Sequence, residues 1–154
     1  MLIAMKIERH FVVAAVHLIL IKKGRILLLR RYNTGWSDGK YSVVAGHLER
    51  NETVESAMVR EAMEEAGISV GKRDLEFAHV MHRKSAQARK SDENRIDFFF
   101  RARKWRGVPK NMEPDKCDDL RWFELDALPE NMVPYVRHVI ADILSGKTYS
   151  EVGW

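Results

Sequence analysis

Two apolar runs near the start of the chain predict a β-hairpin. Phe11–Ile21 and Ile26–Arg31 are rich in aliphatic and β-branched residues, as strands are. Four residues, Lys22 to Arg25, separate the two runs, and they include Gly24. Because glycine adopts the positive φ that tight hairpin turns require, we expect the chain to reverse direction there.

Further strands are predicted where short apolar runs lie between polar or glycine-containing segments. The predicted strands are Tyr41–Val44, Leu75–Met81, Ile96–Ala102 and Leu120–Phe123. The predicted loops are Tyr32–Lys40, Gly46–Asn51 and the polar, basic segment Arg83–Asn94.

Two segments have the composition and spacing of helices. Glu52–Ala66 is rich in alanine and methionine, Thr53 suits the N-cap, and Gly67 follows at the position of a helix-ending glycine. In Val133–Leu144, apolar residues recur at helical spacing. The order of strands, helix, strands and helix predicts an α/β or α+β domain in which one mixed sheet is flanked by helices.

The composition is that of one globular domain. The chain has 154 residues, of which 45% are hydrophobic and 31% charged, and a chain of this size buries about 70% of the surface that it exposes when unfolded. No repeat or linker divides it, so we expect one domain over residues 1–154. The single cysteine, Cys117, excludes an intrachain disulfide, and no spacing of Cys and His suggests a zinc site.

The apolar run Phe11–Ile21 is too short to cross a bilayer, and His17 interrupts it. It also lacks the cleavage site of a signal peptide, so we expect a cytoplasmic protein without a membrane partner. The net charge of +4 and the pI near 9.3 fit either an anionic partner such as a nucleotide or simple solubility. This charge is far below that of dedicated nucleic-acid binders, so a nucleic-acid partner is not expected.

Three glutamates of the first predicted helix share one face. At about 100° per residue, Glu61, Glu64 and Glu65 fall on one arc, next to the apolar arc that faces the core. Like charges at this spacing destabilise a helix by roughly a few tenths of a kcal/mol per pair, and partial burial increases that cost. Arg60 reaches Glu64 at i+4, but one arginine cannot neutralise three acids.

Two interpretations fit this acidic face. A hard cation such as Mg²⁺ or Mn²⁺ would relieve the repulsion, because oxygen ligands suit these ions. A solvated acidic helix face, which is common, would need no ion. On the helix alone, the solvated face is favoured.

The residues around the helix complete a longer pattern. Gly46–Ile68 reads G-H-L-E-R-N-E-T-V-E-S-A-M-V-R-E-A-M-E-E-A-G-I. This segment resembles the Nudix box, G-x5-E-x7-R-E-U-x-E-E-x-G-U, in which U is apolar. The fixed positions are filled by Gly46, Glu52, Arg60, Glu61, Glu64, Glu65 and Gly67. The hairpin, the loop 32–40 and the closing helix also look like the family's domain, so the resemblance extends over nearly the whole chain.

The resemblance implies a mixed sheet between helices, with the box as loop, helix and loop. It also implies a metal site. Glu61, Glu65 and the backbone carbonyl of Gly46 or its neighbour look like metal ligands. Glu64 looks like a further ligand or like the base that activates a water molecule.

The resemblance also implies an ion pair between Arg60 and Glu52 that fixes the box. Such a pair has a physical purpose, because a base must be held within hydrogen-bond reach of the water that it deprotonates. Family members often have Pro and Gly where this chain has Val44 and Ala45. We therefore expect the geometry of the loop before Gly46 to differ locally.

One carboxylate outside the box is expected to complete the metal site. The segment 113–123 resembles the region after the box in the family's nucleoside-triphosphate pyrophosphohydrolases, where such a carboxylate is common. Glu113 and Asp118 are the candidates, and each equally suits a polar loop that enters a strand.

Three residues are expected to contact the substrate. Asn131 and Tyr135 lie where such enzymes contact a base, and an asparagine side chain offers both a donor and an acceptor. Asn131 equally suits the cap of the last helix. Arg83 suits a phosphate, or else a solvated loop. Asp97, at the head of its strand, either points toward the site or ends the loop.

The function implied by the resemblance is Mg²⁺- or Mn²⁺-dependent hydrolysis of a diphosphate bond. The expected substrate is a nucleoside triphosphate, including one with an oxidised base, and the products are the monophosphate and pyrophosphate. The alternatives are a hydrolase of ADP-ribose, sugar nucleotides or dinucleoside polyphosphates, and a catalytically silent nucleotide-sensing module. A silent module is expected to lose box carboxylates, and this chain keeps them all. The sequence leaves monomer and homodimer open.

Overall fold

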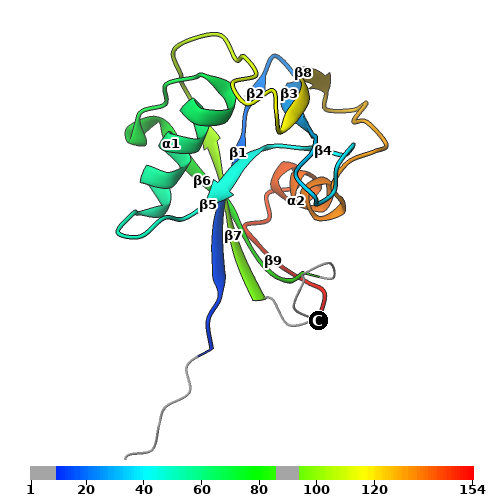
Figure 1. Ribbon diagram of the computed structural model, residues 1–154. Helices are drawn as coiled ribbons and strands as arrows, with labels where there is room; N and C mark the ends of the chain where they lie inside the picture. The colour runs from blue at the N-terminus through cyan, green and yellow to red at the C-terminus, as the bar shows by residue number, and fades with distance from the viewer. Residues whose placement is uncertain (1–9, 86–93) are drawn as a thin grey trace, which may run out of the picture.

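The chain reverses at the predicted turn, but the two apolar runs pair only at that end. The structure is a computed structural model that describes residues 10–85 and 94–154 (Figure 1). Lys23 and Gly24 have φ of 51° and 75°, as a type I′ turn requires. Strand β2 (Ile21–Lys22) pairs with β3 (Arg25–Arg31), whereas β1 (Val13–Ile19) pairs with other strands. The predicted hairpin is confirmed at its tip and is wrong over the rest of its length.

Strand β1 lies inside a five-stranded mixed sheet, with strand order β5-β1-β7-β6-β9. The other members are β5 (Val44–His47), β6 (Leu75–Lys84), β7 (Asn94–Ala102) and β9 (Tyr149–Val152). β1 runs antiparallel to β5 and parallel to β7. Because the last five residues of β1 are all buried, an inner position in the sheet suits it better than an edge.

A second, antiparallel sheet contains β2, β3, β4 (Tyr41–Ser42) and β8 (Cys117–Glu124), with β8 paired to β3. The expected single mixed sheet is therefore corrected to two sheets. The physical reason lies in the first apolar run, which leaves the first sheet after Ile19 and enters the second at Ile21. One run of apolar residues thus contributes to both sheets.

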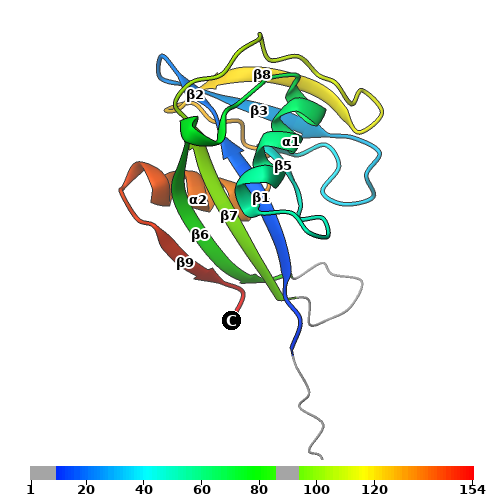
Figure 2. The same ribbon diagram turned by 90° about the vertical axis from the view of Figure 1, so that its left-hand side faces the viewer.

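Two helices cover opposite faces of the five-stranded sheet (Figures 1 and 2). Helix α1 (Val54–Ala66) packs on β1 and β5, and α2 (Pro134–Leu144) packs on β6. Phe100 belongs to the core cluster on the α1 side and Phe99 to the cluster on the α2 side, as strand alternation requires. The expected arrangement of a mixed sheet between helices is confirmed.

The helix ends follow local capping rules. The Thr53 side chain accepts a hydrogen bond from the backbone N–H of Ser56, and Gly67 ends α1 with a φ of 64°. α1 begins two residues after the predicted Glu52, and α2 begins with Pro134 at the first turn, where a proline is tolerated. Among the described residues, no helix is long and apolar enough to cross a membrane.

Several strands extend beyond their apolar residues. The polar ends of the predicted loop 83–94 belong to strands, because Lys84 pairs with Asn94 in the β6–β7 ladder. Residues 86–93 of that loop lie outside the described residues. β5 occupies the start of the predicted loop 46–51, and β8 begins three residues before the predicted Leu120. β9 has no counterpart in the sequence prediction.

Candidate functional site

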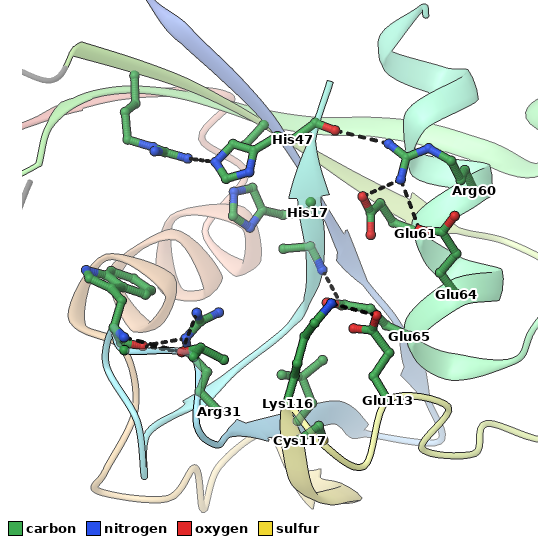
Figure 3. Close-up of a pocket in the computed structure, with 18 of the residues that line it drawn as sticks. His17, Arg31, His47, Arg60, Glu61, Glu64, Glu65, Glu113, Lys116 and Cys117 are labelled. Atoms are coloured by element: carbon green, nitrogen blue, oxygen red, sulfur yellow. Dashed lines mark hydrogen bonds and ion pairs between the residues drawn. The ribbon is translucent and has the colours of Figure 1, made fainter. Parts of the chain in front are cut away.

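A cavity of about 840 Å³ opens where α1, β5, β3 and the start of α2 come together. The box residues Gly46, Arg60, Glu61, Glu64 and Glu65 line it. Figure 3 shows the last four of them. The candidates from outside the box that also line it are Arg83, Glu113 and Tyr135. The structure therefore brings eight of the expected site residues to one cavity.

Helix α1 turns three carboxylates toward this cavity. Glu61 is buried, Glu65 is half-buried and Glu64 is exposed. Glu61 packs directly against β5, since a Cβ added to Gly46 would lie 1.8 Å from its Oε1. Only glycine leaves room for the carboxylate at that point, which gives Gly46 a steric role.

Arg60 organises the box through several contacts. Its guanidinium donates to both oxygens of Glu52, at 2.9 and 3.0 Å, so the predicted ion pair is present. It also donates to Glu61 at 2.6 Å, to Glu64 at 3.1 Å and to the His47 carbonyl at 3.0 Å. These bonds tie α1 to the segment that follows β5. Glu52 does not line the cavity, and its pKa is lowered chiefly by the hydrogen bond from Arg60.

Glu65 is held by the backbone of β5 and not by Arg60. The backbone N–H of Ala45 donates to its Oε2 at 2.9 Å. Burial raises the pKa of Glu65 to about 8 against this hydrogen bond, and the charges of Glu61 and Glu113 act in the same direction. Because a main-chain N–H makes the contact and Ala45 has no positive φ, alanine is compatible with this position.

Of the two candidate carboxylates outside the box, only Glu113 lines the cavity. Glu113 lines the cavity, accepts a hydrogen bond from Lys116 at 2.9 Å and acts on the pKa values of Glu61 and Glu65. Asp118 instead pairs with Arg30 at 2.7 Å, outside the cavity lining. Glu61, Glu64, Glu65 and Glu113 are called the carboxylate cluster below.

The chemistry of the carboxylate cluster fits a hard divalent cation. Burial also raises the pKa of Glu61, although Arg60 opposes the effect. Carboxylate oxygens are the donors that Mg²⁺ and Mn²⁺ prefer. In residues 10–85 and 94–154, no three acidic, His or Cys side chains are gathered closely enough to coordinate one ion as they stand. Arg60 draws Glu61 and Glu64 toward itself, while Ala45 holds Glu65.

Across the cavity, a second wall carries cations and aromatic rings. The Arg31 guanidinium lies 4.7 Å from the centroid of Trp36, and that of Arg83 lies 3.9 Å from the centroid of Tyr135. The two rings are 6.4 Å apart. These four residues, which all line the cavity, are called the arginine wall below. Figure 3 shows Arg31 across the pocket from the glutamates.

Asp97 is fully buried behind this wall. His17 Nε2 lies 3.3 Å from its Oδ1, and Arg83 Nε donates to its Oδ2. Burial opposes ionisation, but His17 and Arg83 outweigh it and hold the pKa of Asp97 at about 2. The sequence left open whether Asp97 points toward the site. It lies behind the wall and bonds Arg83, without lining the cavity itself.

Asn131 lies outside the cavity lining. Its side-chain amide donates to the Gly39 carbonyl at 2.8 Å, and its own carbonyl accepts from the Tyr41 N–H. It does not cap the last helix, since Val133 holds the N-cap position and makes no side-chain capping bond. The contact of Asn131 with a base stays a prediction, and the observed contact is to the loop after β3.

Sequence reasoning missed Arg31, Trp36 and His17. His17 gave the one available signal, because it is a polar residue within an otherwise apolar run. Its ring stacks on Phe99 with centroids 4.4 Å apart, and it lines the cavity. Arg31 and Trp36 had no periodic signal, since Arg31 ends β3 and Trp36 lies within the turn-rich segment that follows it.

A family model described as the NUDIX domain matches residues 10–143. The NAD-capped RNA hydrolase NudC of Chromobacterium violaceum is 30% identical over 117 residues, which cover 76% of this chain and 40% of that protein. The oxidized purine nucleoside triphosphate hydrolase of Danio rerio is 28% identical over 113 residues, which cover 72% of this chain and 65% of that protein. The chain therefore spans less than half the length of the NudC relative.

A solved structure of a NUDIX hydrolase also matches this chain. The crystal structure of the MutT NUDIX hydrolase from Burkholderia pseudomallei superposes with a TM-score of 0.77 at 26% identity. The match covers 86% of this chain and 98% of that one.

Proposed function

This chain belongs to the NUDIX family of hydrolases, and we propose that it cleaves a diphosphate bond in a nucleotide-like substrate with a bound Mg²⁺ or Mn²⁺. The observation that carries this proposal is the carboxylate cluster beside the cavity. Glu61 and Glu65 are crowded, buried to different degrees and raised in pKa, as ligands that await a cation would be.

The residues divide the work as follows. Glu61, Glu65 and Glu113 would hold the ion, with a backbone carbonyl near Gly46. When bound, the ion neutralises phosphate oxygens and lowers the pKa of a coordinated water. Glu64, the most exposed of the cluster, accepts the proton as the water oxygen attacks phosphorus. The bond from that phosphorus to the bridging oxygen then breaks, and the leaving phosphate takes the electron pair. Arg60 restrains Glu64 from the side.

A nucleoside triphosphate is the substrate that we favour, with the monophosphate and pyrophosphate as products. The name of the Danio rerio relative, an oxidized purine nucleoside triphosphate hydrolase, supports this choice. The cavity of about 840 Å³ has room for such a ligand. ADP-ribose, sugar nucleotides and dinucleoside polyphosphates are the alternatives. A catalytically silent module is disfavoured, because every box carboxylate is present and the whole carboxylate cluster lines the cavity.

The test is a substrate panel. The purified protein is incubated with Mg²⁺ and with dNTPs, oxidised dNTPs, ADP-ribose, dinucleoside polyphosphates, sugar nucleotides and NAD, and the products are identified. We expect hydrolysis of a diphosphate bond that stops in excess EDTA and returns with Mg²⁺ or Mn²⁺. Full activity in excess chelator, or no turnover of any member of the panel, would overturn the proposal.

A further inference from the structure

The arginine wall is built to present positive charge to the cavity. Arg83 is only 5% exposed, yet it lines the cavity. The Nε of Arg83 donates a hydrogen bond to Asp97, and the ring of Tyr135 covers one face of the guanidinium. Within the described part of the chain, the terminal nitrogens of Arg83 make no hydrogen bond. An arginine fixed in this way has little rotamer freedom left to lose when it binds a ligand.

Arg31 is fixed in a similar way. Its Nε donates to the Trp36 carbonyl at 2.8 Å, and its Nη2 donates to Thr34 Oγ1 at 3.0 Å. Both acceptors are uncharged, and Arg31 makes no ion pair with a carboxylate of the described residues. Arg31 and Arg83 therefore both line the cavity, while the carboxylate behind the wall, Asp97, is shared by His17, Arg83 and Arg95. The wall has an excess of positive charge.

The wall and the carboxylate cluster line the same cavity, and residues that support each of them are neighbours in one strand pair. Asp97, which bonds Arg83, also contacts His17. His17 on β1 lies directly opposite Ala45 on β5, and the N–H of Ala45 holds Glu65. Residues opposite each other in antiparallel strands have Cα atoms about 5 Å apart. A ligand whose diphosphate lies at the carboxylate cluster can therefore extend a neighbouring anionic group toward Arg31 and Arg83.

We propose that the arginine wall binds a third phosphate of the substrate, next to the diphosphate that is cleaved, and that Asp97 is the positioning residue for Arg83. This inference rests on the proposed function and adds the reason for a preference for triphosphates over diphosphates. A guanidinium fork matches the geometry of phosphate oxygens, and such charge-assisted bonds are strong.

The binding test is independent of metal and of turnover. Inorganic triphosphate is titrated into the protein in excess EDTA by calorimetry. We expect Arg83→Gln and Arg31→Gln each to weaken binding by about 10-fold or more, as the loss of a charge-assisted hydrogen bond should. Arg30→Gln is the matched control, because it removes the same charge from a neighbouring residue that pairs with Asp118 outside the cavity lining. Equal binding by the wild type and both wall variants would overturn the inference.

The kinetic test compares a nucleoside triphosphate with the diphosphate of the same base. The ratio of their kcat/KM values should fall about 10-fold in Arg83→Gln, mainly through KM for the triphosphate. Asp97→Asn should also raise that KM while kcat changes little, which a general loss of folded protein would not produce. If Arg83→Gln fails to fold, Arg31→Gln carries both tests.

The outcomes separate the two proposals. Metal-independent triphosphate binding that depends on the wall, without turnover of any substrate, would contradict the proposed function and support the phosphate-binding role of the wall. EDTA-sensitive hydrolysis would support the proposed function. If the wall variants then kept the wild-type ratio of kcat/KM for triphosphate to kcat/KM for diphosphate, the phosphate-binding role of the wall would be contradicted. A change in purine preference with an unchanged ratio would also overturn the inference, because Arg83 would then bind a base edge.

Discussion

The carboxylate cluster and the arginine wall face one cavity but are built in opposite ways. The cluster takes three of its four members from a single helix, whereas the wall takes its members from β3, the loop after it, β6 and α2. Glu61 and Glu65 in the cluster have raised pKa values, and the carboxylate behind the wall, Asp97, has a lowered one. The four carboxylates of the cluster outnumber the two cations that bond them, Arg60 and Lys116, while the wall has an excess of positive charge, so the two regions suit different parts of one ligand.

The sharpest way to test this division is to remove a cluster carboxylate. Glu64→Gln and Glu65→Gln should each lower kcat by at least ~10² while the fold survives, because Glu64 is the proposed general base and Glu65 a proposed ligand of the ion that activates the water. Steady-state kinetics with Mg²⁺ measure it, and circular dichroism reports the fold. Glu55→Gln is the matched control, since Glu55 is exposed in the first turn of α1. If both variants kept wild-type turnover, the carboxylate cluster would not be the catalytic site.

Gly46→Ala tests the steric side of the cluster. The new Cβ would lie 1.8 Å from Glu61 Oε1, so the carboxylate must swing away from β5. We expect kcat/KM to fall by ~10–10², as displacement of a catalytic group does, with a much smaller loss of folding free energy because only the end of a side chain moves. Gly71→Ala is the control, since that glycine has ordinary φ and lies outside the cavity lining. Unchanged kinetics would show that Glu61 need not occupy this place.

The pH dependence of stability should have opposite signs in the two regions. In EDTA, folded Glu65 keeps its proton up to about pH 8, while an ordinary glutamate releases it near 4.5, so Glu65 makes the free energy of unfolding fall as the pH rises between these values. Asp97, with a pKa of about 2 against an ordinary 3.8, contributes stability above pH 3.8 that is lost as the pH falls toward 2.

Urea unfolding in EDTA at several pH values checks both signs. Glu65→Gln should flatten the fall in stability between pH 5 and 8, and Asp97→Asn should flatten the loss below about pH 4. Mg²⁺ should oppose the first effect, because it binds the ionised carboxylates. A Glu65→Gln variant with the wild-type slope would contradict the raised pKa.

The sequence predicted the cluster well because its geometry is local. Helical spacing alone places Glu61, Glu64 and Glu65 on one face, and Thr53 and Gly67 mark the helix ends. Glu113 and Asp118 could not be separated, since the partner of Asp118 is Arg30, 88 residues away in sequence. The register of β3 against β8 brings Arg30 and Asp118 together, and no local sequence pattern reveals that register.

Two members of the wall, Arg31 and Trp36, were beyond sequence reasoning for the same reason. Arg83 was expected in a polar loop, but pairing with β7 continues β6 through it and turns it onto Asp97. β9 was missed because its burial alternates only weakly and its pairing partner, β6, lies far away in sequence. The split into two sheets likewise depends on where the first apolar run bends.

The smallest effect on activity is expected at Asn131, which belongs to neither the carboxylate cluster nor the arginine wall. Its amide bonds the Gly39 carbonyl on the exposed surface, so Asn131→Ala should lower the free energy of unfolding by about 0.5–1 kcal/mol. Discrimination among bases should stay unchanged, because the side chain does not line the cavity. The measurement is kcat/KM for purine and pyrimidine triphosphates beside a urea melt. A loss of discrimination of ~1 kcal/mol or more would restore Asn131 to a base-binding role and would require the loop after β3 to move when substrate binds.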